Sequence, residues 1–469
     1  MDLKGEIDMK GVESLLRSKN LDNERISIAN ASDIFAAHKD SASDFHLLLA
    51  SLNERNHEKA NQKIAASFAE TLASDGALRN KLTSREFASC LIALAKWDDE
   101  VFQAAAVRLA ARIEIDSRLC DSLSGAQIAD CLTAFGKWHK EEACRRAALR
   151  LSMRLAGDKT LRLTLDAPDV IECLNALCKW DKEPICRASG IYLAARISSD
   201  SPLWNDLSGH EIGICLNALS KWPDHENSVK AGAYLAKQIV TNDRLLSRMN
   251  GHAIANALYA LGKWHGNEAV FFAGRRLASR IVTDETVVKQ LNGVRLANCL
   301  SALGEWALDS ACQRAIVRLA TRVVEDGPLR HNLNGRHVAV CLYTLAKLHT
   351  DKTCRTAAGQ LSRRLATDSS ICNRLSAKHV VNCLTSLGDM EDDPACRSAA
   401  VRLSQRLSSD SVLVAQLGGE AVSNCLTALS KFQTDVACRD AVTRLLQRAA
   451  AHEAPHERLD AAVVQRSFS

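Results

Sequence analysis

The 469-residue sequence has few aromatic residues, few prolines and no long apolar run. Aromatic residues make up 4% of the chain, and there are 7 prolines. A membrane-spanning helix needs roughly 18 or more consecutive apolar residues. No such stretch is present, so we expect no membrane span. The N-terminal stretch carries scattered charges and no apolar core, which excludes a secretory signal peptide.

The cysteines lack the spacing that metal sites and redox motifs require. There are 17, and no two of them form a CxxC pair. An odd count without ligand spacing argues against a disulfide framework or a zinc site, and it favours reduced thiols in a cytosol-like compartment. HExxH sequences, phosphate-binding loops and nucleophile elbows are also missing. We therefore expect no enzyme, no cofactor, no metal and no small-molecule substrate. The net charge of +5 neither requires nor excludes a nucleic-acid partner.

What the sequence does contain is an internal repeat, revealed by its tryptophans. Six of them follow one another at a 42-residue step, except that the first step is one residue shorter: Trp97, Trp138, Trp180, Trp222, Trp264 and Trp306. Three further steps of the same length reach Leu348, Met390 and Phe432. All nine residues are large and apolar, and we call this position the anchor. A fixed period of this length is typical of helical-repeat proteins.

Helix-start signals recur in register with the anchor. Fourteen residues before it stand residues that favour the N-cap of a helix: Thr83, Ser124, Asp166, Ser208, Asn250, Asn292, Asn334, Ser376 and Gly418. Apolar residues flank each cap as a hydrophobic staple, and an apolar stripe of helical period then leads to the anchor. A second helix is expected from about three residues past the anchor, and a third, short helix after an Asp-rich turn.

These signals predict an all-α fold, a right-handed α-solenoid of armadillo/HEAT-like repeats with about nine 42-residue three-helix units. The predicted divisions are a weakly patterned segment over residues 1–42, a degenerate capping repeat over 43–82, nine tandem repeats over 83–450 and a flexible tail over 451–469. A solenoid offers an extended surface for a partner, and we expect the chain to be a monomer.

Most of the recurring polar and sulfur-bearing side chains are interpreted as structural. Fourteen of the 17 cysteines stand seven residues before or six after the anchor, where a small apolar side chain suits a helix contact. An arginine sixteen residues past the anchor is followed four residues later by an aspartate, which predicts an internal ion pair. The lysines that precede the anchor are expected to cap the first helix.

One row of basic and aromatic residues remains as the candidate partner-binding surface. It stands one helical turn before the arginines just described, and its members are Arg108, Arg150, Arg276, Arg318, Arg402, Arg444, Tyr192 and Tyr234, with Gln360 interrupting the row. No internal partner for these arginines is evident from the sequence. They are the residues that we expect to contact an acidic partner or phosphates.

The segment EIGICLNALSKWPD (211–224) contains Ser220-Lys221-Trp222-Pro223, and CLxALxKW recurs in other copies. With its 42-residue spacing, the array resembles the SKWP-repeat type III effectors of plant-pathogenic bacteria, including the XopAD-like group, over about residues 83–450. The resemblance implies secretion by a type III system into the host cell, a virulence role and a host-protein partner. It implies no catalytic residues.

A second resemblance supports an alternative. IANALYALGKW (254–264) and LANCLSALGEW (296–306) are similar to the helix of octotricopeptide-type repeats, which bind RNA. Those arrays have units of about 38 residues and usually end in a RAP domain, which is not found here. In an RNA-reading array a few surface positions would vary from copy to copy. The variable position five residues before the anchor, occupied by Asn175, Tyr259 or Thr385 in different copies, fits this pattern.

Overall fold

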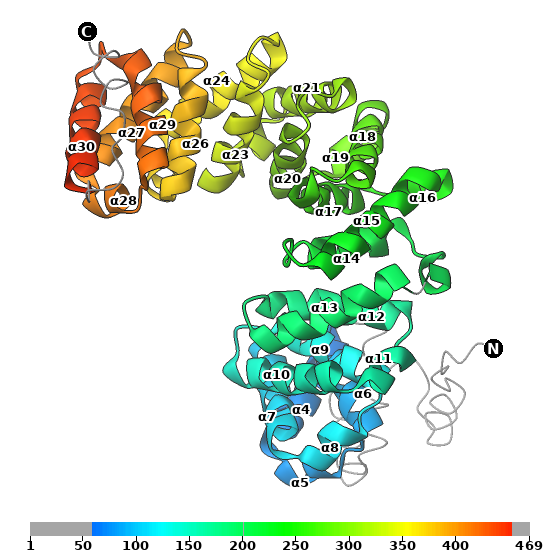
Figure 1. Ribbon diagram of the computed structural model, residues 1–469. Coiled ribbons are helices and arrows are strands. Elements are labelled where there is room, and N and C mark those ends of the chain that lie inside the picture. Colours follow the sequence, from blue (N-terminus) through cyan, green and yellow to red (C-terminus); the bar gives the residue numbers. More distant parts are fainter. Residues whose placement is uncertain (1–58, 200, 453–469) are drawn as a thin grey trace. The chain divides into compact units, whose positions relative to one another are not determined.

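The computed structural model describes residues 59–199 and 201–452, and this part of the chain contains helices and no strand (Figure 1). The structure is therefore an all-α helical-repeat solenoid, as predicted. Residues 1–42, the first part of the expected capping repeat (43–58) and most of the expected tail (453–469) lie outside the described residues. The described part of the capping repeat forms α4 (Lys59–Ser74) and α5 (Gly76–Lys81).

The helices recur in sets of three with the predicted period. The first helices, which end just before the anchor, are α6 (Ser84–Ala95), α9 (Gly125–Lys137), α12 (Ala167–Leu177), α14 (Gly209–Leu219), α17 (Gly251–Leu261), α20 (Gly293–Gly304), α23 (Gly335–Ala346), α26 (Ala377–Gly388) and α29 (Gly419–Leu429). The second helices are α7 (Glu100–Ile115), α10 (Glu142–Gly157), α13 (Pro184–Ser199), α15 (Glu226–Thr241), α18 (Glu268–Thr283), α21 (Ser310–Glu325), α24 (Lys352–Thr367), α27 (Pro394–Ser409) and α30 (Val436–His452).

A third, short helix completes each of the first eight sets. These short helices are α8 (Ser117–Ser122), α11 (Lys159–Thr164), the 3-10 helix η2 (Ser201–Trp204), α16 (Asp243–Arg248), α19 (Glu285–Gln290), α22 (Gly327–His331), α25 (Ser369–Asn373) and α28 (Ser411–Ala415). In three copies the anchor lies in a separate 3-10 turn after the first helix: η1 (Cys178–Trp180), η3 (Gly262–Trp264) and η4 (Ser430–Phe432).

The expected N-caps form in most copies of the first helix. The side chains of Thr83, Ser124 and Asp166 each accept a hydrogen bond from the backbone N–H three residues later and complete a capping box. Asn250 caps α17 in the same way, but the cap of α26 does not form, because the Ser376 hydroxyl hydrogen-bonds to the His379 ring instead. Capping by a side chain explains why the sequence located these helix starts so closely.

Like helices pack against like helices. Two compact units are formed, one from the described parts of residues 1–207 with 218–231, and one from 208–217 with 232–452. In the first unit α6, α9 and α12 pack in sequence order, as do α4, α7, α10 and α13. In the second unit the order is α17, α20, α23, α26 and α29, alongside α18, α21, α24, α27 and α30 (Figure 1).

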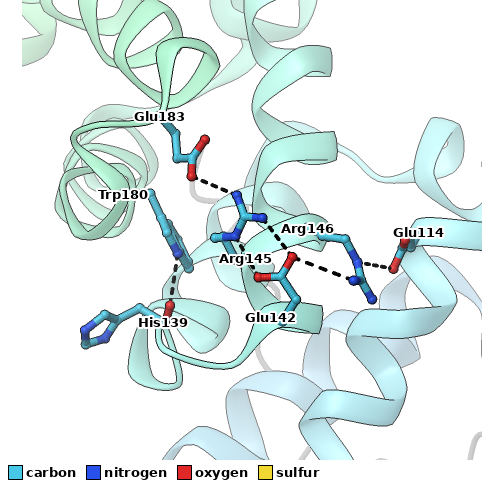
Figure 2. Close-up of polar contacts among 7 residues, drawn as sticks. All are labelled: Glu114, His139, Glu142, Arg145, Arg146, Trp180 and Glu183. Carbon is cyan, nitrogen blue, oxygen red and sulfur yellow. Dashed lines mark hydrogen bonds and ion pairs between the residues drawn. The ribbon is translucent and has the colours of Figure 1, made fainter.

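The anchor tryptophans join each repeat to the one before it. Trp222 is 2% exposed, and its ring covers Gly190 of α13, where an added Cβ would lie 2.3 Å from the ring. Gly232 and Gly274 stand ten residues past their own anchors, as Gly190 does, and their places for a Cβ are likewise occupied by the next anchor's ring. The ring of Trp180 also donates a hydrogen bond from Nε1 to the carbonyl of His139, at 3.1 Å (Figure 2).

All 17 cysteines are buried and free. Burial raises the pKa of the Cys215 and Cys341 thiols to about 12, so these sulfurs are held as neutral thiols. Cys186 and Cys396 lie 3.4 Å from the hydroxyl oxygens of Ser152 and Ser362 on neighbouring second helices. The two cysteine rows therefore pack between helices of adjoining repeats.

Candidate interaction surfaces

The structure gives internal partners to three arginines of the predicted partner-binding row. Arg150 donates to the carbonyl of Glu114 and, at 2.7 Å, to the hydroxyl of Ser117. Arg276 and Arg444 donate to the carbonyls of Val240 and Ser408. Each acceptor lies near the C-terminal end of a second helix in the preceding repeat, where carbonyls lack partners within the helix. The interpretation that these arginines have no internal partner is therefore wrong for these three.

Where the row has no arginine, at Tyr192 and Gln360, an arginine of the preceding short helix caps the second helix in its place. Where the row has Tyr192, an arginine of the preceding short helix, Arg162, binds the carbonyls of Leu155 and Ala156. Its guanidinium carbon lies 4.6 Å from the centre of the Tyr192 ring. Where the row has Gln360, Arg330 binds the carbonyls of Val323 and Val324 at 2.6 and 3.0 Å. The sequence reading missed this exchange, because the two arginine positions lie on different helices.

The remaining members of the row differ in their surroundings. Arg108 is exposed on α7, and Tyr234 is half-buried on α15. Arg318 and Arg402 are half-buried, and the described residues offer neither of them a hydrogen bond or ion pair that meets the usual distances. Arg318 lines an open pocket of about 390 Å³ with Glu285 and Glu325 among its walls. Part of the predicted row therefore caps the ends of second helices, and the row does not form one continuous binding surface.

The second arginine row, sixteen residues past the anchor, is structural in two ways. The predicted ion pairs form between Arg280 and Asp284, at 2.8 Å, and between Arg322 and Asp326, at 3.3 Å. Arg154 shows the second role, which the sequence did not reveal, because it donates to the carbonyls of Cys120 and Leu123 in the preceding repeat. These arginines therefore tie the short helix of one repeat to the second helix of the next.

The lysines before the anchor cap first helices, as expected, but each caps the first helix of the preceding repeat and not its own. The ammonium of Lys347 donates to the carbonyl of Gly304 at 2.8 Å, and that of Lys431 to the carbonyl of Gly388 at 3.0 Å. Lys137 binds the carbonyl of Ala95 at 2.7 Å. Cations near these C-terminal carbonyls are favoured by the helix dipole.

A chain of ion pairs crosses three second helices of the first unit (Figure 2). Arg145 lies between Glu142 and Glu183, with both nitrogen–oxygen distances at 2.7 Å. Arg146 pairs with Glu114 at 2.9 Å and lies 3.7 Å from Glu142. The side chains are exposed to about a third or more, so the charges satisfy one another at the surface and contribute little stability.

The first helices of the first unit carry an acidic cluster. Burial, followed by the charges of Glu172 and Asp169, raises the pKa of Asp130 on α9 to about 7. Burial and neighbouring acids also raise the pKa of Glu172 and Asp169 on α12. Across the described residues, no group of three or more His, Cys, Asp or Glu side chains is arranged to hold a metal ion. The cluster is therefore a local accumulation of carboxyl groups that repel one another.

The corresponding face in the second unit has the opposite character. The positions eleven or twelve before the anchor, in the first turn of the helix, carry His252 on α17, Arg295 on α20, Arg336 on α23 and Lys378 on α26. The position eight before the anchor carries four asparagines, on α17, α20, α26 and α29: Asn256, Asn298, Asn382 and Asn424. Residues spaced by four and three along a helix share one face. We call this set of side chains the asparagine face.

The asparagine face has polar groups without protein partners. Asn256, Asn298 and Asn382 are half-buried, yet their amides form no hydrogen bond within the described parts of the chain. The side chains of Arg295, Arg336 and Lys378 form no ion pair there either. Tyr259 and Tyr343, five residues before the anchor, lie under Lys263 and Lys347 at 5.1 and 4.8 Å from nitrogen to ring centre.

Sequence reasoning singled out only the variable position beside these asparagines. The signal that was available lies in the third residue of each first helix. It is Glu86, Gln127 and Asp169 in the first unit, where it completes capping boxes. In the second unit it is Arg295 on α20, a cation that opposes the helix dipole, and His337 on α23, whose pKa is lowered by burial and by Arg336.

Comparison with known proteins gives the chain no family. No family model and no curated protein matches it. Among solved structures, a match is found to an engineered protein from the Northeast Structural Genomics Consortium, with 14% sequence identity and a TM-score of 0.18, covering 86% of this chain and 99% of that one. So low a score adds nothing to the fold described above. No helix in the described part of the chain is both long and apolar enough for a membrane span.

Proposed function

We propose that the protein is a non-catalytic helical-repeat scaffold that binds a protein partner on the asparagine face. The observation that carries this proposal is the set of half-buried asparagine amides that lack hydrogen-bond partners in three repeats. These amides remain open to water, so a bound peptide group can take the place of water as their hydrogen-bond partner. The recurrence of the same side chains also favours binding over catalysis, because an active site requires unlike groups that converge at one place.

The resemblance to SKWP-repeat effectors extends the proposal. It suggests that the chain is delivered by a type III system into a host cell, where a reducing cytosol keeps the thiols free and the partner is a host protein. RNA is the alternative partner. Two members of the lysine row are replaced by Glu305 and Asp389, and acidic groups beside a phosphate backbone weaken binding. This favours a protein partner over RNA.

Site-specific photo-crosslinking tests the proposed surface. A photoreactive amino acid replaces Thr385, which lies three residues after Asn382 and so beside the asparagine face, or, as the control, Arg314 on the exposed side of α21. After irradiation in host-cell extract, we expect adducts from position 385 that resist ribonuclease and are destroyed by protease. Adducts that disappear with ribonuclease would show that the partner is RNA. Equal adducts from both positions would show that the asparagine face is not the binding surface.

Delivery is tested separately from binding. The full chain is fused to an adenylate-cyclase reporter and expressed in a plant-pathogenic bacterium with and without a functional type III apparatus. We expect cyclic AMP to rise in host cells only when the apparatus is functional. An equal signal from both strains would remove the effector proposal and leave the scaffold proposal intact.

A further inference from the structure

The asparagine face combines side-chain amides with positively charged side chains. Each asparagine side chain offers N–H donors and a C=O acceptor, the same pair that a peptide group presents. The helices α17, α20, α23 and α26 pack side by side, so Asn256 and Asn298 are separated by about one interhelical distance, roughly 8–10 Å, and Asn298 and Asn382 by about two. Val340 interrupts the series on α23, where it contributes no amide.

Three consecutive first helices, α20, α23 and α26, carry a cation and no acidic residue in their first turn, whereas Arg85 in the first turn of α6 is followed by Glu86. A positive charge in the first turn of a helix opposes the helix dipole. Arg295, Arg336 and Lys378 all stand in first turns, on three consecutive first helices, and no carboxylate of the described residues pairs with them. In the first unit the first turns of α6 and α12 contain the acidic residues Glu86 and Asp169. Departures from local rules without internal compensation are expected at functional sites.

The distance between neighbouring helices of the asparagine face favours an extended polypeptide as the partner. An extended polypeptide advances about 3.2–3.4 Å per residue, so about three residues span one interhelical distance of roughly 8–10 Å. A segment lying across the helices would therefore present one side chain to each cation of α20, α23 and α26 at about every third residue, and peptide groups to the asparagines of α17, α20 and α26. The cations require that side chain to be acidic.

Resting on the proposed function, we propose that the asparagine face binds an extended protein segment that carries an acidic residue at about every third position. Its peptide groups pair with the amides of Asn256, Asn298 and Asn382. Its carboxylates pair with Arg295, Arg336 and Lys378. Charge complementarity and the matching repeat distance both follow from the geometry described above.

Binding of labelled peptides to the full chain tests this proposal. The probes are fluorescein-labelled 12-residue peptides: (Glu-Ser-Gly)₄, the neutral (Gln-Ser-Gly)₄, and a peptide of the same composition as the first with its four glutamates adjacent. Fluorescence anisotropy reports the affinity. We expect (Glu-Ser-Gly)₄ to bind about tenfold more tightly than the neutral peptide and several-fold more tightly than the peptide with adjacent glutamates. No binding of (Glu-Ser-Gly)₄, or equal affinity for the two acidic peptides, would overturn the proposal.

Two variants locate the binding and a third controls for net charge. The triple changes Asn256→Ala, Asn298→Ala and Asn382→Ala, and Arg295→Gln, Arg336→Gln and Lys378→Gln, should each weaken binding about tenfold. Arg187→Gln, Arg314→Gln and Arg363→Gln remove the same charge from exposed positions of the second helices and should have little effect. An equal loss in the control would show that attraction is non-specific. Circular dichroism confirms that each variant is folded.

A 12-nucleotide single-stranded RNA provides the last arm. We expect it to compete weakly with (Glu-Ser-Gly)₄, and tighter binding of the RNA than of the peptide would overturn the proposal. Failure here is distinguishable from failure of the proposed function. If the peptides do not bind but position 385 still crosslinks to protein, the scaffold proposal stands and only the class of segment is wrong.

Discussion

At the scale of single residues, a missing β-carbon determines how closely repeats join. Gly190, Gly232 and Gly274 leave the space that the rings of Trp222, Trp264 and the following anchor fill. The equivalent residue after Trp306 is Ile316, and there the next anchor is the smaller Leu348. A large side chain therefore faces a small one at each of these positions, as close packing requires.

Replacing Gly190 by alanine should destabilise the protein. The new methyl group would lie 2.3 Å from the Trp222 ring, far inside contact distance, and the ring has little room to move because it is buried. We expect a loss of about 1–3 kcal/mol from overpacking, despite the better helix propensity of alanine. Urea denaturation followed by circular dichroism measures the change.

Gly157→Ala is the matched control for that experiment. Gly157 ends α10, and no atom lies within 4 Å of the place where its Cβ would be. This variant should be neutral or slightly stabilising. If both variants had the same stability, the ring of Trp222 would not be fixed against α13.

Asp130 should make stability depend on pH. The pKa of its carboxyl group is raised to about 7 by burial and by Glu172 and Asp169, whereas an unfolded chain has a value near 3.9. Between these values the folded state binds more protons than the unfolded state, so stability falls as pH rises from about 4 to 7. Removing the charge with Asp130→Asn should therefore stabilise the protein at pH 8 by about 1–2 kcal/mol.

The effect should vanish near pH 4, where the wild-type carboxyl group is already protonated in the folded state. Denaturation midpoints at pH 4, 6 and 8 measure it, with Asp121→Asn as a control at an exposed position. A stabilisation by Asp130→Asn that is the same at all three pH values would contradict a titrating carboxyl group and indicate a packing effect.

At the scale of elements, arginine side chains cap the C-terminal ends of the second helices by donating hydrogen bonds to their last carbonyls. The second helix α7 is sealed by Arg150 of the next repeat, whereas α10 is sealed by Arg162 of its own repeat. Both arrangements satisfy carbonyls that no helix can satisfy internally. Where the row has Tyr192 in place of an arginine, Arg162 supplies the cap, so the C-terminal carbonyls of α10 are still satisfied.

Arg150→Gln should loosen the end of α7. The change removes the hydrogen bonds to the Glu114 carbonyl and the Ser117 hydroxyl, and we expect a loss of about 1–2 kcal/mol. Arg146→Gln is the control, because its ion pair with Glu114 is exposed on both sides and should contribute less than about 0.5 kcal/mol. Hydrogen exchange at the end of α7 should accelerate only in the first variant. Equal losses would mean that the capping contact is no stronger than a surface ion pair.

At the scale of the whole molecule, the sequence predicted the helices well and the surfaces poorly. Caps, staples and anchor spacing are local signals, and the structure confirms the helix sets that they predict. The roles of Arg150, Arg162 and Lys347 depend on contacts 36, 6 and 43 residues away along the chain. The contacts of Arg150 and Lys347 follow from how one repeat stacks on the next, which the spacing of a single repeat does not reveal, and that of Arg162 follows from how the short helix folds back on its own repeat. The cations of the asparagine face stand at two repeat positions, eleven residues before the anchor for Arg295 and twelve for Arg336 and Lys378, so no single position of the repeat reveals them.

The junction at Ile316 and Leu348 offers a test of how the repeats stack. The register of the array places Leu348 over Ile316, as Trp306 lies over Gly274. The stability of a repeat array is close to a sum of contacts between neighbouring repeats. Replacing Ile316 and Leu348 together by glycine and tryptophan should therefore reproduce here the packing of a tryptophan ring on a glycine. Ile316→Gly alone should cost about 3–5 kcal/mol through the cavity it leaves, and Leu348→Trp alone about 1–3 kcal/mol through overpacking.

The double variant should recover much of that loss, because the new ring fills the new space. A double-mutant cycle on urea denaturation should give a favourable coupling of about 2–3 kcal/mol. Steeper unfolding of the double variant would further show that the repeated joint makes the array more cooperative, since the slope reports the surface exposed in a single transition. Strict additivity of the two single changes would show that residues 316 and 348 do not face each other, and that the tryptophan–glycine joint ends with Trp306.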